Sequence, residues 1–344
     1  MPASLQSTDG AAPPPAALEP ADQKLVDGVL GPGAGQRRAL AKSITLIEST
    51  RADHQARAQQ VLAALLPHTG RAIRVGISGV PGSGKSTFIE ALGNFLIDAG
   101  KRVAVLAVDP SSSISGGSIL GDKTRMESLC QREEAFIRPS PTSGALGGVA
   151  EKTREAMLLF EAAGFDVIIV ETVGVGQSET MVAGMVDLFV LLQLANAGDD
   201  LQTIKKGIVE IADLVLFNKA DIDAQATELA RMQVQTALTM LRPASKNWRV
   251  PVLAVSSLAR RGIDAFWADV ERYRDTMTGT GEFDAKRRRQ ALAWMWNLID
   301  SGVRQHFRRH PAVGAELAQL TEAVAEGRIT PGAAAYRLLD CIKH

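Results

Sequence analysis

A glycine-rich segment at residues 79–86 carries the strongest chemical signal in the chain. It reads G-V-P-G-S-G-K-S, follows the apolar run 73–78 directly, and opens a helical pattern. Glycines at this spacing let backbone N–H groups surround a phosphate, and the start of a helix adds a favourable electrostatic field. We expect Lys85 to reach the β- and γ-phosphates of a nucleotide and the Ser86 hydroxyl to bind Mg²⁺. The residues expected to hold the nucleotide here are Gly79, Val80, Pro81, Gly82, Ser83, Gly84, Lys85, Ser86 and Thr87.

A second signal, N-K-A-D at residues 218–221, follows the apolar run 214–217. The Asp221 carboxylate can accept hydrogen bonds from the ring N1–H and the exocyclic amine of guanine, a donor pattern that adenine lacks. The S-S-L segment at 256–258 comes after the next apolar run, where GTPases place a loop whose backbone contacts guanine O6; alone it would be an ordinary polar turn. Together these segments predict a guanine nucleotide, GTP or GDP. The residues assigned to the base are Asn218, Lys219, Asp221, Ser256, Ser257 and Leu258.

Three carboxylates stand close to the ends of expected strands or loops and are candidates for a magnesium site. Glu171 ends an apolar run at a place where most GTPases carry Asp, and Asp109 closes another. Asp122 follows a polar loop and could equally be a helix N-cap. Mg²⁺ needs only one or two direct carboxylates, so the others could act through water. Gly174, just after Glu171, could place its N–H near the γ-phosphate.

Two further side chains are weaker candidates for catalysis. Gln177 follows the glycines of G-V-G-Q-S-E and could position a water molecule, or it could be an ordinary loop residue. Lys205 lies in A-G-D-D-L-Q-T-I-K-K and could face the nucleotide, or it could only solvate the following helix.

The elements that must position these residues alternate between short β-branched runs and helical stretches. This alternation predicts an α/β P-loop NTPase fold, with a mostly parallel central sheet flanked by helices. The expected strands are 73–78, 103–108, 135–138, 166–171, 188–194, 214–218 and 250–255. We expect a disordered tail at 1–20, a helical extension at 21–70, the GTPase domain at 71–280 and a helical arm at 281–344. Glycines at 31–35 should break the extension into two helices.

The composition and net charge of the chain bear on which classes of partner it binds and where it is located. Lys+Arg and Asp+Glu both number 38, so the formal net charge is zero and nothing favours nucleic acid or a membrane surface. No apolar run reaches the ~18 residues of a membrane span. Two cysteines without zinc-like spacing and no visible signal peptide indicate a cytoplasmic protein.

Taken in order, these segments resemble the MeaB/ArgK-type GTPases, the methylmalonyl-CoA mutase-associated G-protein chaperones of the SIMIBI class. The most specific pieces are V-D-P-S-S with G-G-S-I-L-G-D-K-T-R-M at 108–126, R-P-S-P-T-S-G-A-L-G-G at 138–148, and V-E-T-V-G-V-G-Q-S-E at 170–179. The resemblance covers most of the chain beyond the N-terminal tail. Family members commonly read P-G-x-G-D-E-L-Q-G-I-K where this chain reads A-N-A-G-D-D-L-Q-T-I-K, a departure that leaves Lys205 in place.

The resemblance implies a homodimer formed through helical extensions and slow GTP hydrolysis that a partner stimulates. It implies that the protein gates adenosylcobalamin delivery to, and protects, a cobalamin-dependent acyl-CoA mutase, with methylmalonyl-CoA mutase as the default partner. By the same analogy, Ser86, Asp109, Asp122 and Glu171 surround Mg²⁺. Two alternatives stay open at this point: a nickel-delivery metallochaperone GTPase, which would need a Cys/His metal site, and a transport-associated ATPase or kinase, which residues 218–221 disfavour.

Overall fold

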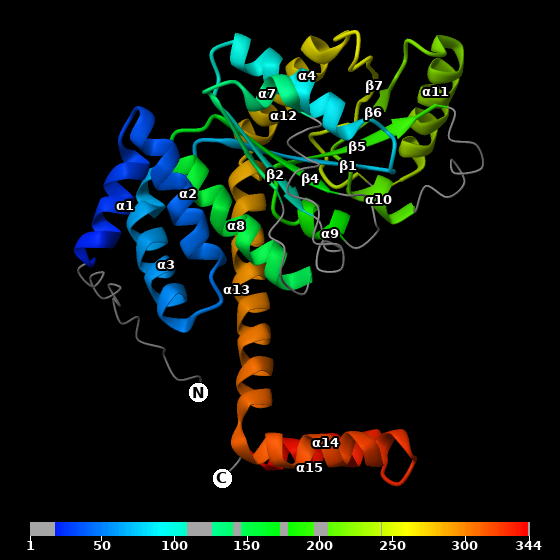
Figure 1. The fold of residues 1–344 in the computed structure, drawn as a ribbon. Helices are drawn as coiled ribbons and strands as arrows, with labels where there is room; N and C mark the ends of the chain where they lie inside the picture. The colour runs from blue at the N-terminus through cyan, green and yellow to red at the C-terminus, as the bar shows by residue number, and fades with distance from the viewer. Residues whose placement is uncertain are drawn as a thin grey trace, which may run out of the picture. The chain divides into compact units, whose positions relative to one another are not determined.

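A seven-stranded parallel sheet forms the centre of the molecule (Figure 1). The computed structural model describes residues 18–108, 126–139, 146–172, 178–195, 206–241 and 243–342. The strand order is β3-β2-β4-β1-β5-β6-β7, and every neighbouring pair is parallel. This confirms the predicted fold class. The strands are β1 (Ile73–Gly79), β2 (Val103–Val108), β3 (Ala135–Arg138), β4 (Val167–Thr172), β5 (Leu188–Leu194), β6 (Leu214–Asn218) and β7 (Val252–Ala254).

The strand order places the topological switch point beside the central strand β1. The chain leaves β1 toward β2 on one side of the sheet and leaves β4 toward β5 on the other, while β1 and β4 are hydrogen-bonded neighbours. In open α/β sheets, the crevice for a ligand forms at the carboxyl ends of two such strands. The glycine-rich segment follows β1 and Glu171 lies near the end of β4, so both flank this crevice.

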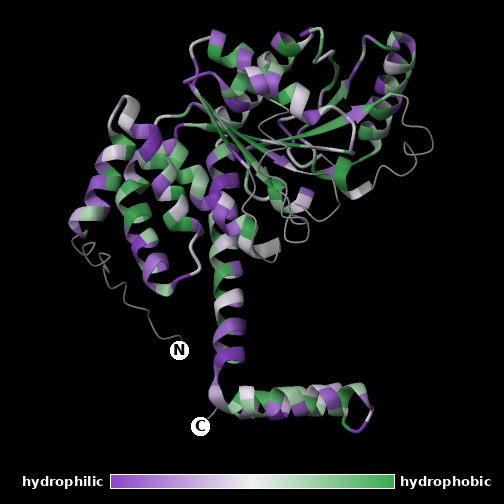
Figure 2. Cartoon of the chain, viewed as in Figure 1, coloured by the Kyte–Doolittle hydropathy of each residue, from purple (hydrophilic) through white to green (hydrophobic). Residues whose placement is uncertain are grey.

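Helices cover both faces of the sheet, which explains why its strands are continuously apolar (Figures 1 and 2). Along β2, Val103 and Val105 belong to one hydrophobic core, while Ala104 and Leu106 belong to the other. Burying each such Val or Leu contributes about 1.5–3 kcal/mol. The helices of the first face are α4 (Lys85–Asp98), α7 (Glu127–Cys130) and α12 (Ile263–Gly279). Those of the second face are α8 (Leu146–Ala162), α9 (Ser178–Ala183), α10 (Lys206–Ile211) and α11 (Ala224–Met240).

The N-terminal extension packs against α8 as three helices, α1 (Pro20–Leu30), α2 (Ala34–Glu48) and α3 (Ala52–Leu65). The expectation of two helices was therefore wrong. The missed break falls at Ser49, which takes extended backbone angles and whose hydroxyl lies 2.8 Å from His54 Nδ1. A bidentate ion pair from Arg57 to the fully buried Asp22 joins α3 to α1. Breaking one partner of such a pair leaves a buried charge uncompensated, so the pair fixes how these helices meet.

The C-terminal helices form a second compact unit, which begins at Asp284. They are α13 (Glu282–Arg309), α14 (Pro311–Ala325) and α15 (Pro331–Asp340). The last two pack together, and Thr330 caps α15 by accepting a hydrogen bond from the Ala333 N–H. None of the residues of α13 is buried, although several are large and apolar. None of the described helices is both long and apolar enough to cross a membrane.

Candidate nucleotide-binding site

The glycine-rich loop turns sharply between β1 and α4, and two of its glycines are sterically required. Gly84 has φ +86°, in the left-handed region, and a Cβ there would lie 2.5 Å from Asn218 Nδ2. A Cβ on Gly79 would lie 2.3 Å from the Leu192 carbonyl oxygen of the neighbouring strand. Helix α4 then begins, with Phe88 N–H donating to the Gly84 carbonyl at 2.9 Å. The first N–H groups of a helix have no acceptor within that helix, so a helix that begins directly after this loop suits a phosphate-binding site.

Lys85 is held across this loop although its charge is largely buried. Its ammonium donates to the carbonyl oxygens of Gly79 at 2.8 Å and Val80 at 3.2 Å. A buried cation needs such partners, because desolvating it alone would cost several kcal/mol. Beside it, the Ser83 hydroxyl oxygen is buried and has no hydrogen-bond partner within the described ranges. The loop therefore concentrates polar groups that could interact with an anion.

Asn218 connects the loop after β6 to the phosphate loop. Its Nδ2 donates to the Ser83 carbonyl at 2.9 Å, and its Oδ1 accepts from both the N–H and the hydroxyl of Ser257, at 3.2 and 2.7 Å. Asn218 is buried, so these bonds replace the water it has lost. The three segments predicted to surround a guanine nucleotide are thus brought together by a single side chain.

Asp221 lies on the same loop with its carboxylate exposed. The Ser256 hydroxyl is the main cause that holds the pKa of Asp221 below its ordinary value, and Arg261 adds a smaller electrostatic contribution. An antiparallel bridge between Ser256 and Arg261 shapes the facing loop. Lys219 adopts φ +60°, which turns the chain between Asn218 and Asp221. The carboxylate is therefore ionised and available as a hydrogen-bond acceptor at neutral pH.

Ser86 and Glu171 meet at the crevice between β1 and β4. The Ser86 hydroxyl donates to Glu171 Oε1 at 3.2 Å, and Glu171 is buried. One hydroxyl and one carboxylate at this place form an oxygen donor set that suits Mg²⁺. The other candidates lie outside the described residues: Asp109, Asp122, Gly174, Gln177 and Lys205. Within the described part of the chain, no group of three or more His, Cys, Asp or Glu side chains could hold a metal.

The structure adds residues that the sequence did not single out. The Thr172 hydroxyl donates to the Ser78 hydroxyl at 2.9 Å, joining the ends of β4 and β1 under the crevice. Arg261 is a second addition, through its effect on Asp221. The available signal was positional, since Thr172 and Ser78 are polar residues near the carboxyl ends of two central strands.

Comparison with known proteins decides the family. Residues 40–312 match the model of the family described as methylmalonyl Co-A mutase-associated GTPase MeaB. This chain belongs to the MeaB family. A GTPase of Caulobacter vibrioides is similar to it, with 56% identity over 306 residues that cover 89% of this chain and 94% of the relative. The mitochondrial methylmalonic aciduria type A homolog of Mus musculus is 46% identical over 339 residues, covering 95% and 81%.

One solved structure agrees with the fold of this chain. The crystal structure of a LAO/AO transport system kinase superposes with a TM-score of 0.75 at 37% identity, covering 96% of this chain and 100% of that one. The stretch that matches the MeaB family includes the phosphate loop, Glu171 and Asn218, and it ends near the start of α14. The MeaB family consists of GTPases, so the predicted family and the predicted enzyme class are both confirmed.

Proposed function

We propose that this GTPase is a G-protein chaperone that gates adenosylcobalamin delivery to, and protects, a cobalamin-dependent acyl-CoA mutase, with methylmalonyl-CoA mutase as the first candidate. The observation that carries the proposal is the match to a mutase-associated GTPase family over residues 40–312. The hydrogen bond from Asn218 to the Ser83 carbonyl supports the GTPase part of the proposal, because it joins the proposed base-reading segment to the proposed phosphate-binding segment. A cytoplasmic location remains a prediction.

The described residues support a simple division of labour around GTP. Asp221 would read the guanine edge, and the N–H groups that start α4 would hold the phosphates with Lys85. Ser86 and Glu171, with Asp109 and Asp122, would hold Mg²⁺. The ion would neutralise charge on the β- and γ-phosphate oxygens. Water attacks the γ-phosphorus, its bond to the β–γ bridging oxygen breaks, and GDP and phosphate leave. Gln177 and Lys205 are our candidates for aiding this step, which we expect to be slow until a partner binds.

Helix α13 supports the proposal of a homodimer. Five of its exposed apolar side chains repeat at three- and four-residue spacings and so share one face of the helix. They are Leu292, Met295, Trp296, Ile299 and Val303, while the exposed Leu298 lies off this face. In proteins exposed to solvent, a contiguous stripe of exposed apolar side chains is typical of an interaction surface. We propose that the arm pairs with a second copy of the chain through this stripe.

Nucleotide hydrolysis by purified variants tests the site. Replacing Lys85 by Ala should lower the rate of GTP hydrolysis by about 100-fold or more, because a charge contact to the phosphates is lost. Lys24→Ala, an exposed lysine on α1, is the matched control and should leave the rate unchanged. ATP should compete poorly with GTP. Equal turnover of both nucleotides, or an unaffected Lys85→Ala variant, would contradict the assignment.

The chaperone role needs its own experiment. The protein is mixed with purified adenosylcobalamin-dependent acyl-CoA mutases in the presence of a non-hydrolysable GTP analogue or of GDP. We expect co-elution with one mutase that differs between the two nucleotides, together with a rise in GTP hydrolysis. If no such mutase binds or alters hydrolysis while the protein alone remains an active GTPase, the enzyme assignment stands and the chaperone proposal fails.

A further inference from the structure

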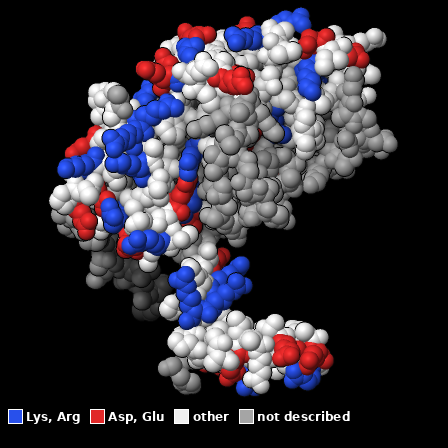
Figure 3. Space-filling view, in the orientation of Figure 1, with Lys and Arg blue, Asp and Glu red and all other residues white. Residues whose placement is uncertain are grey.

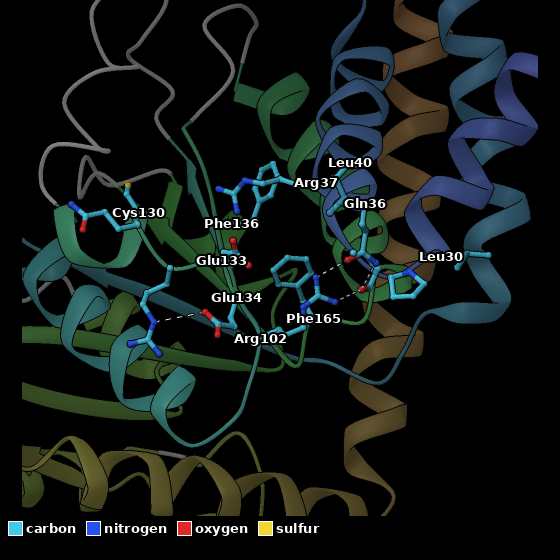
Figure 4. A pocket seen from close by; sticks show the side chains of 15 residues that line it. Leu30, Gln36, Arg37, Leu40, Arg102, Cys130, Glu133, Glu134, Phe136 and Phe165 are labelled. Carbon is cyan, nitrogen blue, oxygen red and sulfur yellow. Dashed lines mark hydrogen bonds and ion pairs between the residues drawn. The ribbon is translucent and has the colours of Figure 1, made fainter.

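A pocket of about 850 Å³ lies between the N-terminal extension and the sheet (Figure 4). Its walls come from α1 and α2, from the turn that joins α7 to β3, and from residues that precede β2 and β4. Arg102 and Phe165 stand before these last two strands, so the pocket lies at the amino ends of strands. The candidate nucleotide site lies at the carboxyl ends. A molecule in this pocket would therefore bind separately from the nucleotide.

One side of the pocket is built by a fully bonded network. Gln36 is buried, and its Nε2 donates to the carbonyl oxygens of Val29 at 2.8 Å and Ala163 at 3.0 Å. Arg102 donates from one nitrogen to Gln36 Oε1 at 2.8 Å and from another to the Ala163 carbonyl. The Arg102 guanidinium also stacks on the Phe165 ring, 4.4 Å from its centroid. A network in which each polar group is satisfied is rigid, so this wall is preorganised.

The arginines around the pocket differ in whether a carboxylate pairs with them. Arg132 forms ion pairs with Asp98 and Glu134. Arg102 and Arg37 form none with any described residue; Arg37 donates to the Ala135 carbonyl and stacks on the Phe136 ring at 5.1 Å. Burial lowers the pKa of Arg102, and the negative charge of Asp166 offsets part of this effect. Figure 3 shows Lys and Arg side chains gathered over this end of α1 and α2.

Apolar surface completes the pocket. Leu30 and Leu40 line it from the extension, and the rings of Phe136 and Phe165 line it from the sheet (Figure 4). A volume of this size, lined by both polar and apolar side chains with several polar groups held in place, can accept a small organic ligand that carries a charged group. Glu133, also in the lining, forms no ion pair within the described ranges and would oppose a negative charge.

We propose that this pocket binds a small organic anion, a carboxylate or phosphate group carried on an apolar or aromatic body, with the anion at Arg37 and Arg102 and the body between Leu40 and Phe136. Arginine suits this role, because its planar fork donates two parallel hydrogen bonds to a carboxylate or phosphate while its face stays stacked on a ring. The site is separate from the proposed GTPase chemistry and does not depend on it.

Fluorine NMR titrations test the proposal on the full chain, kept saturated with GDP and Mg²⁺ so that the nucleotide site is blocked. The probes are 4-fluorobenzoate and 4-fluorophenyl phosphate, with 4-fluorobenzylamine as the cationic control. Arg37→Gln removes the exposed pocket arginine, and Arg38→Gln removes the next arginine on α2, which does not line the pocket. Glu133→Gln removes the opposing charge. Thermal unfolding confirms that each variant is folded.

We expect at least one anion to bind saturably, and which one binds identifies carboxylate or phosphate as the recognised group. Arg37→Gln should weaken this binding about fivefold or more, Arg38→Gln should change it less than about twofold, and Glu133→Gln should strengthen it. Three results would overturn the proposal. They are saturable binding of neither anion, equal binding of the amine, and equal effects of the two arginine variants.

Discussion

The side-chain amide of Asn218 donates to the carbonyl oxygen of Ser83 at 2.9 Å, so the loop after β6 is fixed to the loop after β1. The Oδ1 atom of the same amide accepts a hydrogen bond from the Ser257 hydroxyl at 2.7 Å, so the loop after β7 is also fixed to this side chain. Because Asn218 is buried, losing either partner would leave a polar group unsatisfied, at a cost of about 1–3 kcal/mol. The position of the proposed base-reading carboxylate, Asp221, relative to the phosphate loop therefore depends on this side chain.

Asp221→Asn should convert the nucleotide preference from guanine to xanthine. The carboxylate accepts two hydrogen bonds from guanine, whereas an amide offers one acceptor and one donor, which suits the additional carbonyl of xanthine. We expect affinity for GDP to fall by about 100-fold or more and affinity for XDP to rise, measured by displacement of a fluorescent nucleotide.

Asp223→Asn is the matched control for that substitution. Asp223 lies two residues further along and caps α11 by accepting from the Ala226 N–H at 2.9 Å, a role that Asn fills equally well. It should leave both affinities unchanged. A loss of GDP affinity without any gain for XDP would show that Asp221 supports the loop instead of reading the base.

Glu171→Gln should raise the concentration of Mg²⁺ needed for GTP hydrolysis. The substitution keeps the side chain's shape and its contact with Ser86 but removes the charge that a hard cation prefers. We expect the half-saturating Mg²⁺ concentration to rise about tenfold, while nucleotide affinity without magnesium stays the same or improves. Asp166→Asn, an exposed residue just before the same strand, is the control. An unchanged magnesium dependence would remove Glu171 from the proposed metal site.

The strands of the sheet were predictable because they are buried on both faces and so read as short apolar runs. β2, β3, β5 and β6 begin and end where expected. β7 is shorter than expected, Val252–Ala254, because it is an edge strand paired only with β6 and follows Pro251, which has no N–H to donate. Residue patterns locate buried strands well and edge strands less well.

The contacts that build the site could not be read from the sequence in the same way. The phosphate loop is local, so its spacing alone predicts its conformation. The hydrogen bond between Ser86 and Glu171 spans 85 residues and depends on β1 and β4 being neighbours, which only the strand order shows. The pocket depends on the fold in the same way, because Arg102 and its hydrogen-bond partner Gln36 are 66 residues apart in the sequence. Such groups come together through the fold and leave no local pattern.

Trp296→Glu should convert the proposed homodimer into a monomer. Trp296 is 60% exposed at the centre of the apolar stripe on α13, and a buried tryptophan is a common energetic centre of an interface. We expect the dimer dissociation constant to rise about 100-fold or more, measured by light scattering across a concentration series. Gln305→Glu adds the same charge on the opposite face of α13 and should have no effect. A wild-type chain that is monomeric at every concentration would contradict the proposal directly.

Glu155 should make the stability of the fold depend on pH. It is buried on α8, where it accepts from Gln59 at 2.6 Å and pairs with Lys152 at 3.1 Å, yet burial raises its pKa above the ordinary 4.5. The folded state therefore holds this proton more tightly than the unfolded state. The resulting stabilisation is complete below the unfolded pKa and is lost as pH rises through the folded one. We expect Glu155→Gln to gain stability relative to wild type as pH rises above about 4.5, measured by urea unfolding. Glu151 is a more exposed neighbour on α8, and Glu151→Gln should have the same free energy of unfolding as wild type at each pH. If the difference in free energy of unfolding between Glu155→Gln and wild type does not change with pH, or changes in the opposite direction, the contacts with Gln59 and Lys152 outweigh burial.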